Sequence, residues 1–127
     1  MAKRMHINTA AAPKAIGPYS QAIKLDNLVF LSGQIPLDPT SMELVSGGIQ
    51  QQAKQVFENL SAVAAASGSS LQHAAKLTIY LTDLANFAVV NEIMASYFSQ
   101  PYPARATVEV SALPKGAAIE VDAILAL

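Results

Sequence analysis

The sequence has no cysteine, and this absence removes several kinds of chemistry. Disulfide bonds, thiolate metal sites and thiol nucleophiles are all excluded in a chain of 127 residues without a single Cys. The absence fits a reducing compartment. No stretch of 18 consecutive apolar residues occurs either, so no segment is expected to span a membrane. We therefore expect a cytoplasmic protein.

Charge is also scarce. Charged residues make up 13% of the chain, hydrophobic residues make up 52%, and the formal net charge is −1. Because Lys and Arg form no run, the electrostatic footprint of a nucleic-acid-binding protein is missing, and no nucleic-acid partner is expected. A small monomer normally carries more surface charge. The shortage predicts that part of the surface is buried against another subunit.

Common metal and cofactor motifs are missing as well. The two histidines, His6 and His73, are far apart in the sequence and lack metal-ligand spacing. The sequence has no phosphate-binding loop, dinucleotide-binding fingerprint or Ser-His-Asp order. We therefore expect no metal site and no cofactor.

Hydrophobic patterning predicts a single domain over residues 1–127. The N-terminus, which contains Arg4, is expected to be loose, and residues 9–13 should form an extended or mobile lead-in. A two-residue turn at Asp26 and Asn27 should join the first pair of strands. Strands are expected at residues 19–25, 28–35, 76–82, 106–110 and 119–125.

Two amphipathic helices are expected between these strands. Gly68 should end the first helix, and Asp83 or Asn86 should cap the second. The apolar stripe of the first helix is Ile49, Ala53, Val56, Phe57, Leu60, Val63 and Ala64. That of the second is Phe87, Val90, Ile93, Met94, Tyr97 and Phe98, all expected in the core. Because each helix has one stripe, both should cover the same face of one sheet in an α+β fold. Subunit association would cover an apolar open face.

Arg105 is the most informative candidate for a binding residue. It follows Pro103 and precedes an apolar strand, and the only other arginine is Arg4. A guanidinium presents a planar fork that suits a carboxylate or a phosphate. The alternative is a structural salt bridge to one of three acids, and spacing alone favours it. The three acids are Glu109, Glu120 and Asp122.

Five further residues suggest a site. Glu120 and Asp122 project from the same side of the last strand, where like charges would raise one pKa and divide acid and base roles. A solvated strand face is the simpler interpretation of both acids. Tyr19 and Ser32 offer hydroxyl groups near the first hairpin. Gly33 interrupts an apolar strand, which indicates either a bulge or the close approach of another group.

Several segments, taken together, resemble the RidA (YjgF-type) family. They are residues 15–22 (AIGPYSQA), 32–36 (SGQIP), 103–105 (PAR), 108–110 (VEV), 113–116 (LPKG) and 119–120 (IE), with Asp83-Leu84, Val90-Asn91 and Tyr97-Phe98 between them. The resemblance covers nearly the whole chain. It implies a chorismate-mutase-like α+β fold, with one mixed sheet and two helices packed on one face, that assembles as a homotrimer with clefts between subunits.

The resemblance also implies an activity and a site. RidA proteins hydrolyse reactive 2-imino and 2-enamino acids, such as 2-iminobutanoate and 2-iminopropanoate, to 2-keto acids and ammonia. By resemblance, Arg105 binds the substrate carboxylate and Glu120 positions or activates water. Tyr19, Ser32 and the backbone at Gly33 would line the same cleft. Asn91 also matches a family position. Thr107 stands where many bacterial members have cysteine, so it is expected to line the pocket without thiol-based regulation.

Two other functions remain open from the sequence. A trimer that binds or senses 2-keto acids without turnover would use the same contact at Arg105. An RNA-acting or translation-inhibiting protein is a third interpretation, because parts of this family carry that label. The net charge of −1 and the lack of a basic stripe count against it.

Overall fold

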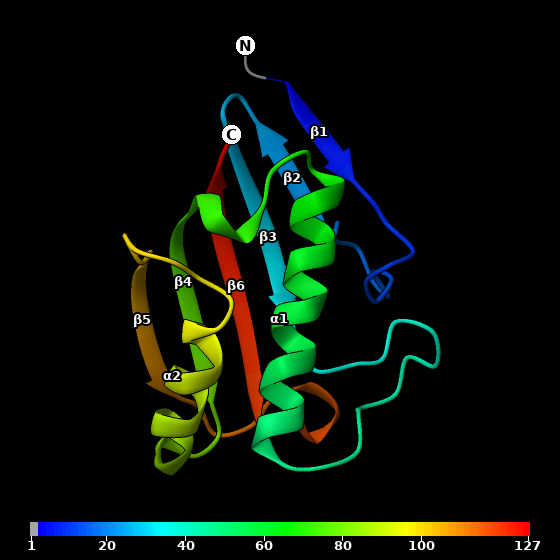
Figure 1. Ribbon diagram of the computed structural model, residues 1–127. Helices are drawn as coiled ribbons and strands as arrows, with labels where there is room; N and C mark the ends of the chain where they lie inside the picture. The colour runs from blue at the N-terminus through cyan, green and yellow to red at the C-terminus, as the bar shows by residue number, and fades with distance from the viewer. Residues whose placement is uncertain (1–2) are drawn as a thin grey trace.

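The computed structural model describes residues 3–127 as two layers, a mixed six-stranded sheet and two α-helices that cover one of its faces (Figure 1). The strand order is β1-β2-β3-β6-β4-β5, and only the β4–β5 pair is parallel. The strands are β1 (Arg4–Ile7), β2 (Ala22–Leu25), β3 (Leu28–Gln34), β4 (Ala74–Leu81), β5 (Ala104–Glu109) and β6 (Ile119–Ala126). The α+β architecture expected from the patterning is confirmed.

Helix α1 (Ile49–Ala66) follows the predicted apolar stripe closely. Except for the partly buried Ile49, every residue of that stripe is buried. The helix ends where the sequence predicts, because Gly68 takes the left-handed backbone angle φ of +84°. Its N–H donates to the carbonyl of Ala65 at 3.0 Å, which satisfies a free carbonyl of the last turn.

Helix α2 (Phe87–Ala95) is shorter than its predicted stripe. The hydroxyl of Ser96 donates to the carbonyl of Ile93 at 2.6 Å where the helix stops, although Phe98 beyond it is still buried. Phe87 was expected in the core, but this prediction is wrong, because its side chain is 37% exposed. Asp83 caps the short 3-10 helix η2 (Leu84–Asn86), and the side chain of Asn86 makes no cap hydrogen bond to α2. The other 3-10 helices are η1 (Leu71–His73) and η3 (Pro114–Gly116).

Two strands differ from the prediction near the N-terminus. The N-terminus around Arg4 was expected to be loose, but it contains β1, which pairs with β2. Of its residues only Ile7 is buried, so the segment has no apolar alternation that could have revealed a strand. Strand β2 begins at Ala22, because a turn closed by the Tyr19 N–H and the Gly17 carbonyl at 2.8 Å precedes it.

The sheet face turned away from the helices is open in this chain. Along β6 the residues from Ile119 to Leu125 alternate, with the odd-numbered ones buried under the helices and the even-numbered ones on the other face. Phe30 and Val108 lie on this open face and are 40% and 42% exposed. No helix within residues 3–127 is long and apolar enough to cross a membrane.

One polar side chain of α1 is fully buried and was absent from the predicted stripe. Asn59 is 1% exposed, and its amide donates to the carbonyls of Leu37 at 3.0 Å and Ile35 at 3.4 Å. Its oxygen accepts a hydrogen bond from Gln55 at 2.8 Å. Asn59 therefore fixes the segment after β3 to the helix layer, and this segment forms part of a cavity wall described below.

Replacing Asn59 with Leu should lower the free energy of unfolding by about 1–3 kcal/mol, because a buried carbonyl loses its donor while the side-chain volume stays similar. Urea denaturation at fixed protein concentration measures the change. Gln55→Ala is the control, since it removes a hydrogen bond to the same amide from a less buried position and should have the smaller effect. Equal stability of Asn59→Leu and the parent would contradict this prediction.

Candidate active site

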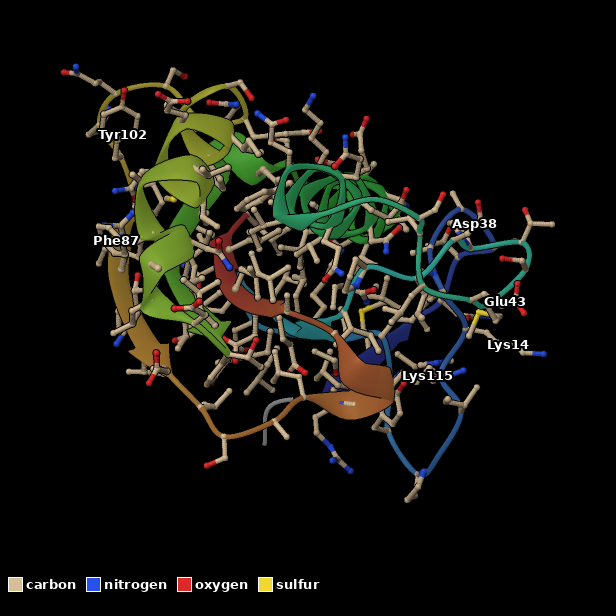
Figure 2. All side chains as sticks on the ribbon, turned by 90° about the horizontal axis from the view of Figure 1, so that it is seen from below. Lys14, Asp38, Glu43, Phe87, Tyr102 and Lys115 are labelled. Carbon is tan, nitrogen blue, oxygen red and sulfur yellow. The ribbon has the colours of Figure 1, made fainter. Side chains whose placement is uncertain are left out.

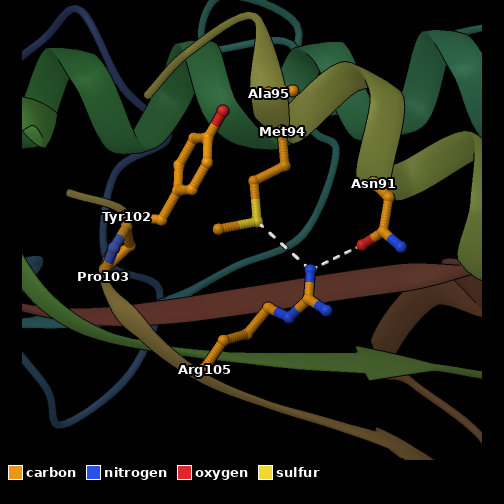
Figure 3. A pocket seen from close by; sticks show the side chains of 6 residues that line it. All are labelled: Asn91, Met94, Ala95, Tyr102, Pro103 and Arg105. Atoms are coloured by element: carbon orange, nitrogen blue, oxygen red, sulfur yellow. Dashed lines mark hydrogen bonds between the residues drawn. The ribbon is translucent and has the colours of Figure 1, made fainter. Parts of the chain in front are cut away.

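Arg105 lies in β5, the edge strand, and its side chain points toward α2 (Figure 3). It pairs in register with Leu77 of β4, which is buried beneath the helices. Its Nη1 donates to Asn91 Oδ1 and lies 3.7 Å from Met94 Sδ. The guanidinium carbon lies 5.2 Å from the centre of the Phe87 ring, within the range of a cation–π contact.

The three acids considered as salt-bridge partners of Arg105 are placed elsewhere. Glu109 accepts a hydrogen bond from the N–H of Leu84 at 2.9 Å. Asp122 accepts one from the hydroxyl of Tyr80 at 3.0 Å. Glu120 projects from the opposite face of the sheet, because it alternates with Ile119 and Val121. The groups that contact the guanidinium are neutral, and its positive charge is not paired with any of these acids.

A cavity of about 470 Å³ lies beside the guanidinium. It is lined by Asn91, Met94, Ala95, Tyr102, Pro103 and Arg105. A small carboxylic acid would fit this volume, which lies at the low end of the range of ligand pockets. The site therefore combines a cation without an acidic partner and room for an anion, and this cavity is called the Arg105 cavity below.

Glu120 lines a second cavity, of about 310 Å³, called the Glu120 cavity below. Segments from four parts of the chain surround it, and most of the lining is apolar. The lining residues are Pro13, Lys14, Ile16, Tyr19, Gln21, Gly33, Gln34, Ile35, Leu37, Met42, Pro114, Lys115 and Glu120. Lys115 Nζ donates to the Met42 carbonyl at 3.3 Å and so ties two of these segments together.

Gly33 and Glu120 are in close contact at the wall of this cavity. A Cβ atom built on Gly33 would lie 2.9 Å from Glu120 Cδ and closer still to its Oε2, a separation that real side chains do not adopt. The β3–β6 register also shifts between Leu31 and Gln34. Both interpretations offered for Gly33 therefore hold: the strand is irregular there, and a carboxylate approaches its backbone.

The environment of Glu120 raises the pKa of its carboxyl above the ordinary value of 4.5. Burial is the main cause, because removal from water disfavours the charged form, and the negative charge of Asp122 adds to it. A carboxyl with a raised pKa can accept or donate a proton closer to neutral pH than an exposed one. The contribution of Asp122 has the direction expected for like charges on one strand, although burial contributes more to the raised pKa of Glu120.

The two cavities are separate in one chain. Tyr102 and Phe87 lie on the side of α2 and β5, whereas Lys14 and Lys115 lie at the other end of the molecule (Figure 2). Arg105 and Glu120 also project from opposite faces of the sheet. Within one chain, Tyr19 and Gly33 lie with Glu120 at one cavity. Asn91 lies with Arg105 at the other, and the two cavities do not meet.

Two expected site residues line neither cavity. The hydroxyl of Ser32 donates to the Ser20 carbonyl at 2.6 Å. Thr107 pairs in register with Ile79 on the helix-covered face, and its Oγ1 is buried without a hydrogen-bond partner. Within residues 3–127, no group of three or more His, Cys, Asp or Glu side chains could hold a metal ion.

Sequence reasoning missed several residues of both cavities, and also Phe87, whose ring contacts Arg105 without lining either cavity. Phe87 and Met94 lie at helical spacing from Asn91 and share its face, so the placement of Asn91 could have pointed to both. Tyr102 directly precedes Pro103 and carried no signal of its own. Gln21 is 1% exposed and holds the Glu120 cavity wall, donating to the Pro13 carbonyl at 2.8 Å.

Comparisons with known proteins show which family and fold this chain resembles. A family model described as endoribonuclease L-PSP matches residues 9–127. Protein DfrA of Myxococcus xanthus is 57% identical over 123 residues, 95% of this chain and 94% of the relative. The human 2-iminobutanoate/2-iminopropanoate deaminase is 47% identical over 121 residues, 95% and 88% of the two chains. A crystal structure of RidA from an Antarctic Psychrobacter bacterium is 50% identical, with a TM-score of 0.93 over 97% and 99% of the chains.

These similarities define the fold as chorismate-mutase-like. In this chain the cavity beside Arg105 lies at the edge of the sheet. The chain belongs to the RidA (YjgF-type) family, to which the matching family model corresponds. The resemblance carried by the short motifs of the sequence is thereby confirmed. The deaminase name is carried by some of its relatives and not by others.

The buried hydroxyl of Thr107 gives a prediction about its role. Replacing Thr107 with Val removes a buried hydroxyl that lacks a partner and keeps the shape, so the free energy of unfolding should rise by about 1 kcal/mol. Thermal or urea unfolding measures this change, with Thr107→Ser as the control that keeps the hydroxyl. A destabilised Thr107→Val variant would instead indicate a hydrogen bond formed in the assembled protein.

Proposed function

We propose that this protein hydrolyses small 2-imino and 2-enamino acids, such as 2-iminobutanoate and 2-iminopropanoate, to 2-keto acids and ammonia. The main observation behind the proposal is that the guanidinium of Arg105 contacts neutral groups and lies beside a cavity. Membership of a family in which the human relative is named as such a deaminase supports it. The proposed setting is the cytoplasm.

Arg105 would bind the carboxylate that every 2-imino acid carries next to its C=N bond. Two parallel hydrogen bonds from a guanidinium fix both the position and the plane of a carboxylate. The reacting carbon, C2, is bonded directly to that carboxylate and would be held at one point. Holding the reactants in this way lowers the entropic part of the barrier.

Glu120 would handle the protons of the reaction. Water adds to C2 of the protonated imine, and Glu120 accepts the proton that the water oxygen loses. Glu120 then gives this proton to the nitrogen of the resulting carbinolamine. As the C–N bond breaks and ammonia departs, the carbinolamine hydroxyl loses its proton to the Glu120 carboxylate and becomes the carbonyl of the 2-keto acid. The raised pKa of the Glu120 carboxyl supports both the accepting and the donating step. An enamine substrate would first gain a proton at C3 to become the imine.

The proposed site is completed by a second copy of the chain. Arg105 and Glu120 lie in different cavities and on opposite faces of one sheet, so they can act on one small substrate only if they come from different subunits. The exposed apolar side chains of the open face favour association. We propose the homotrimer that the family resemblance implies, with Arg105 of one subunit facing the Glu120 cavity of the next.

Arg105→Ala should reduce kcat/KM for 2-iminobutanoate about 10²-fold or more, because two charge-assisted hydrogen bonds of about 1.5–3 kcal/mol each are lost. The assay couples the protein to a threonine dehydratase and follows the rate of 2-keto acid release. Arg4→Ala is the matched control, since it removes the other arginine, in β1, far along the sheet from β5.

The same assay decides between catalysis and binding. Faster release of the keto acid in the presence of the parent protein supports the enzyme. If the parent binds 2-oxobutanoate but leaves the release rate unchanged, the protein is a sensor of 2-keto acids. Parental activity in Arg105→Ala would rule out the proposed role of the guanidinium. Salt-sensitive binding of RNA would favour the third interpretation.

Glu120→Gln should lose activity mainly in kcat, and mixing it with Arg105→Ala should restore part of the loss. In a cyclic trimer mixed at equal amounts, about one quarter of the interfaces receive an intact Arg105 and an intact Glu120. Refolding the two variants together and measuring deaminase activity tests this expectation. Activity no greater than the average of the two variants would show that the residues do not act across an interface.

A further inference from the structure

Three residues on one face of α2 hold the guanidinium of Arg105. Phe87, Asn91 and Met94 are spaced four and three residues apart, so they lie in line along the helix. They contribute a ring face, an amide oxygen and a thioether sulfur. All three groups attract a cation without carrying a negative charge. This set of residues is called the α2 cradle below.

The α2 cradle engages one end of the guanidinium. The two hydrogen-bond acceptors, Asn91 Oδ1 and Met94 Sδ, are both reached by the same nitrogen, Nη1 (Figure 3). A guanidinium has five N–H donors in a fixed plane. With Nη1 directed at the helix, the edge formed by Nε and Nη2 is turned away from those acceptors. That edge has the two parallel donors that a carboxylate needs.

We propose that Asn91 is a positioning residue for Arg105 and does not itself bind the substrate. Its amide oxygen fixes the rotation of the guanidinium, so that the Nε–Nη2 edge faces the ligand. Because this oxygen is neutral, it orients the cation without competing for its charge. A carboxylate at position 91 would instead pair with Arg105 and displace the substrate carboxylate. The inference rests on the proposed function, since it refines how the same site binds an acid.

Asn91→Asp tests the charge part of this proposal with almost no change in shape. The dissociation constant of 2-oxobutanoate, measured by calorimetry, should rise at least about tenfold. The melting temperature should equal or exceed that of the parent, because the new ion pair adds to the packing already present. Asn86→Asp is the matched control. It makes the same chemical change beside the same helix, at a side chain with no cap hydrogen bond, and should change the affinity less than about twofold.

Asn91→Leu tests the orienting part. This substitution keeps the packing and removes the acceptor. The dissociation constant of 2-oxobutanoate should rise about threefold, and the loss of activity toward the imine should be mainly a rise in KM. Nuclear magnetic resonance of the arginine side chains gives a readout independent of activity. Rotation about the Nε–Cζ bond of Arg105 should be slow in the parent and fast in Asn91→Leu. Arg4, the only other arginine, serves as an internal reference in both spectra.

The possible results separate this inference from the proposed function. If the parent binds 2-oxobutanoate but hydrolyses no imine, the proposed function fails while the variants still test the cradle. If the parent is active and Asn91→Asp binds 2-oxobutanoate like the parent, the positioning role is overturned. A loss of binding in Asn91→Asp that accompanies an equal loss in Asn86→Asp, or a lowered melting temperature, also overturns it. Unchanged rotation of Arg105 in Asn91→Leu would do the same.

Discussion

The contact between the Arg105 guanidinium and three neutral groups of α2 is the interaction on which the site depends. A long side chain at a sheet edge would otherwise sample many rotamers, at a cost of about 2 kcal/mol when it is ordered. The ring of Phe87, the amide of Asn91 and the sulfur of Met94 order it in advance. None of them neutralises the charge, so the cation stays available for an anionic ligand.

The pleat of the sheet imposes the second constraint. Successive side chains of a strand point to opposite faces, and the register across β5, β4 and β6 sends Arg105 to the helix side and Glu120 to the open side. No change of rotamer can bring them to one point, because the sheet lies between them. Chemistry that used both residues on one small substrate would therefore need a second chain, as in the proposed trimer.

Much of the fold could be predicted from the sequence, because α1 and the central strands have clear periodicity. Arg105 and Glu120 were also singled out as candidates, since charged residues stand out in apolar strands. Strand β1 was missed because backbone pairing holds it and only Ile7 is buried. Phe87 was assigned to the core because the sequence pattern of an apolar stripe is the same in both cases: an aromatic residue that packs on the core and one that contacts a cation. The sequence could not show whether an acid pairs with Arg105. The answer depends on how the strands are aligned in the sheet, and spacing along the chain does not reveal that alignment.

The open face links the proposed assembly to the chemistry of Glu120. Phe30 and Val108 are exposed on the same face as this carboxyl, so a subunit that covers them also removes water from the surroundings of Glu120. Further burial would raise the pKa of Glu120 beyond the shift already present, whereas an approaching guanidinium would lower it. The two effects of association oppose each other. In the proposed trimer, the protonation of Glu120 would therefore be set by how closely the neighbouring Arg105 approaches, and the geometry of the interface would tune the proposed chemistry.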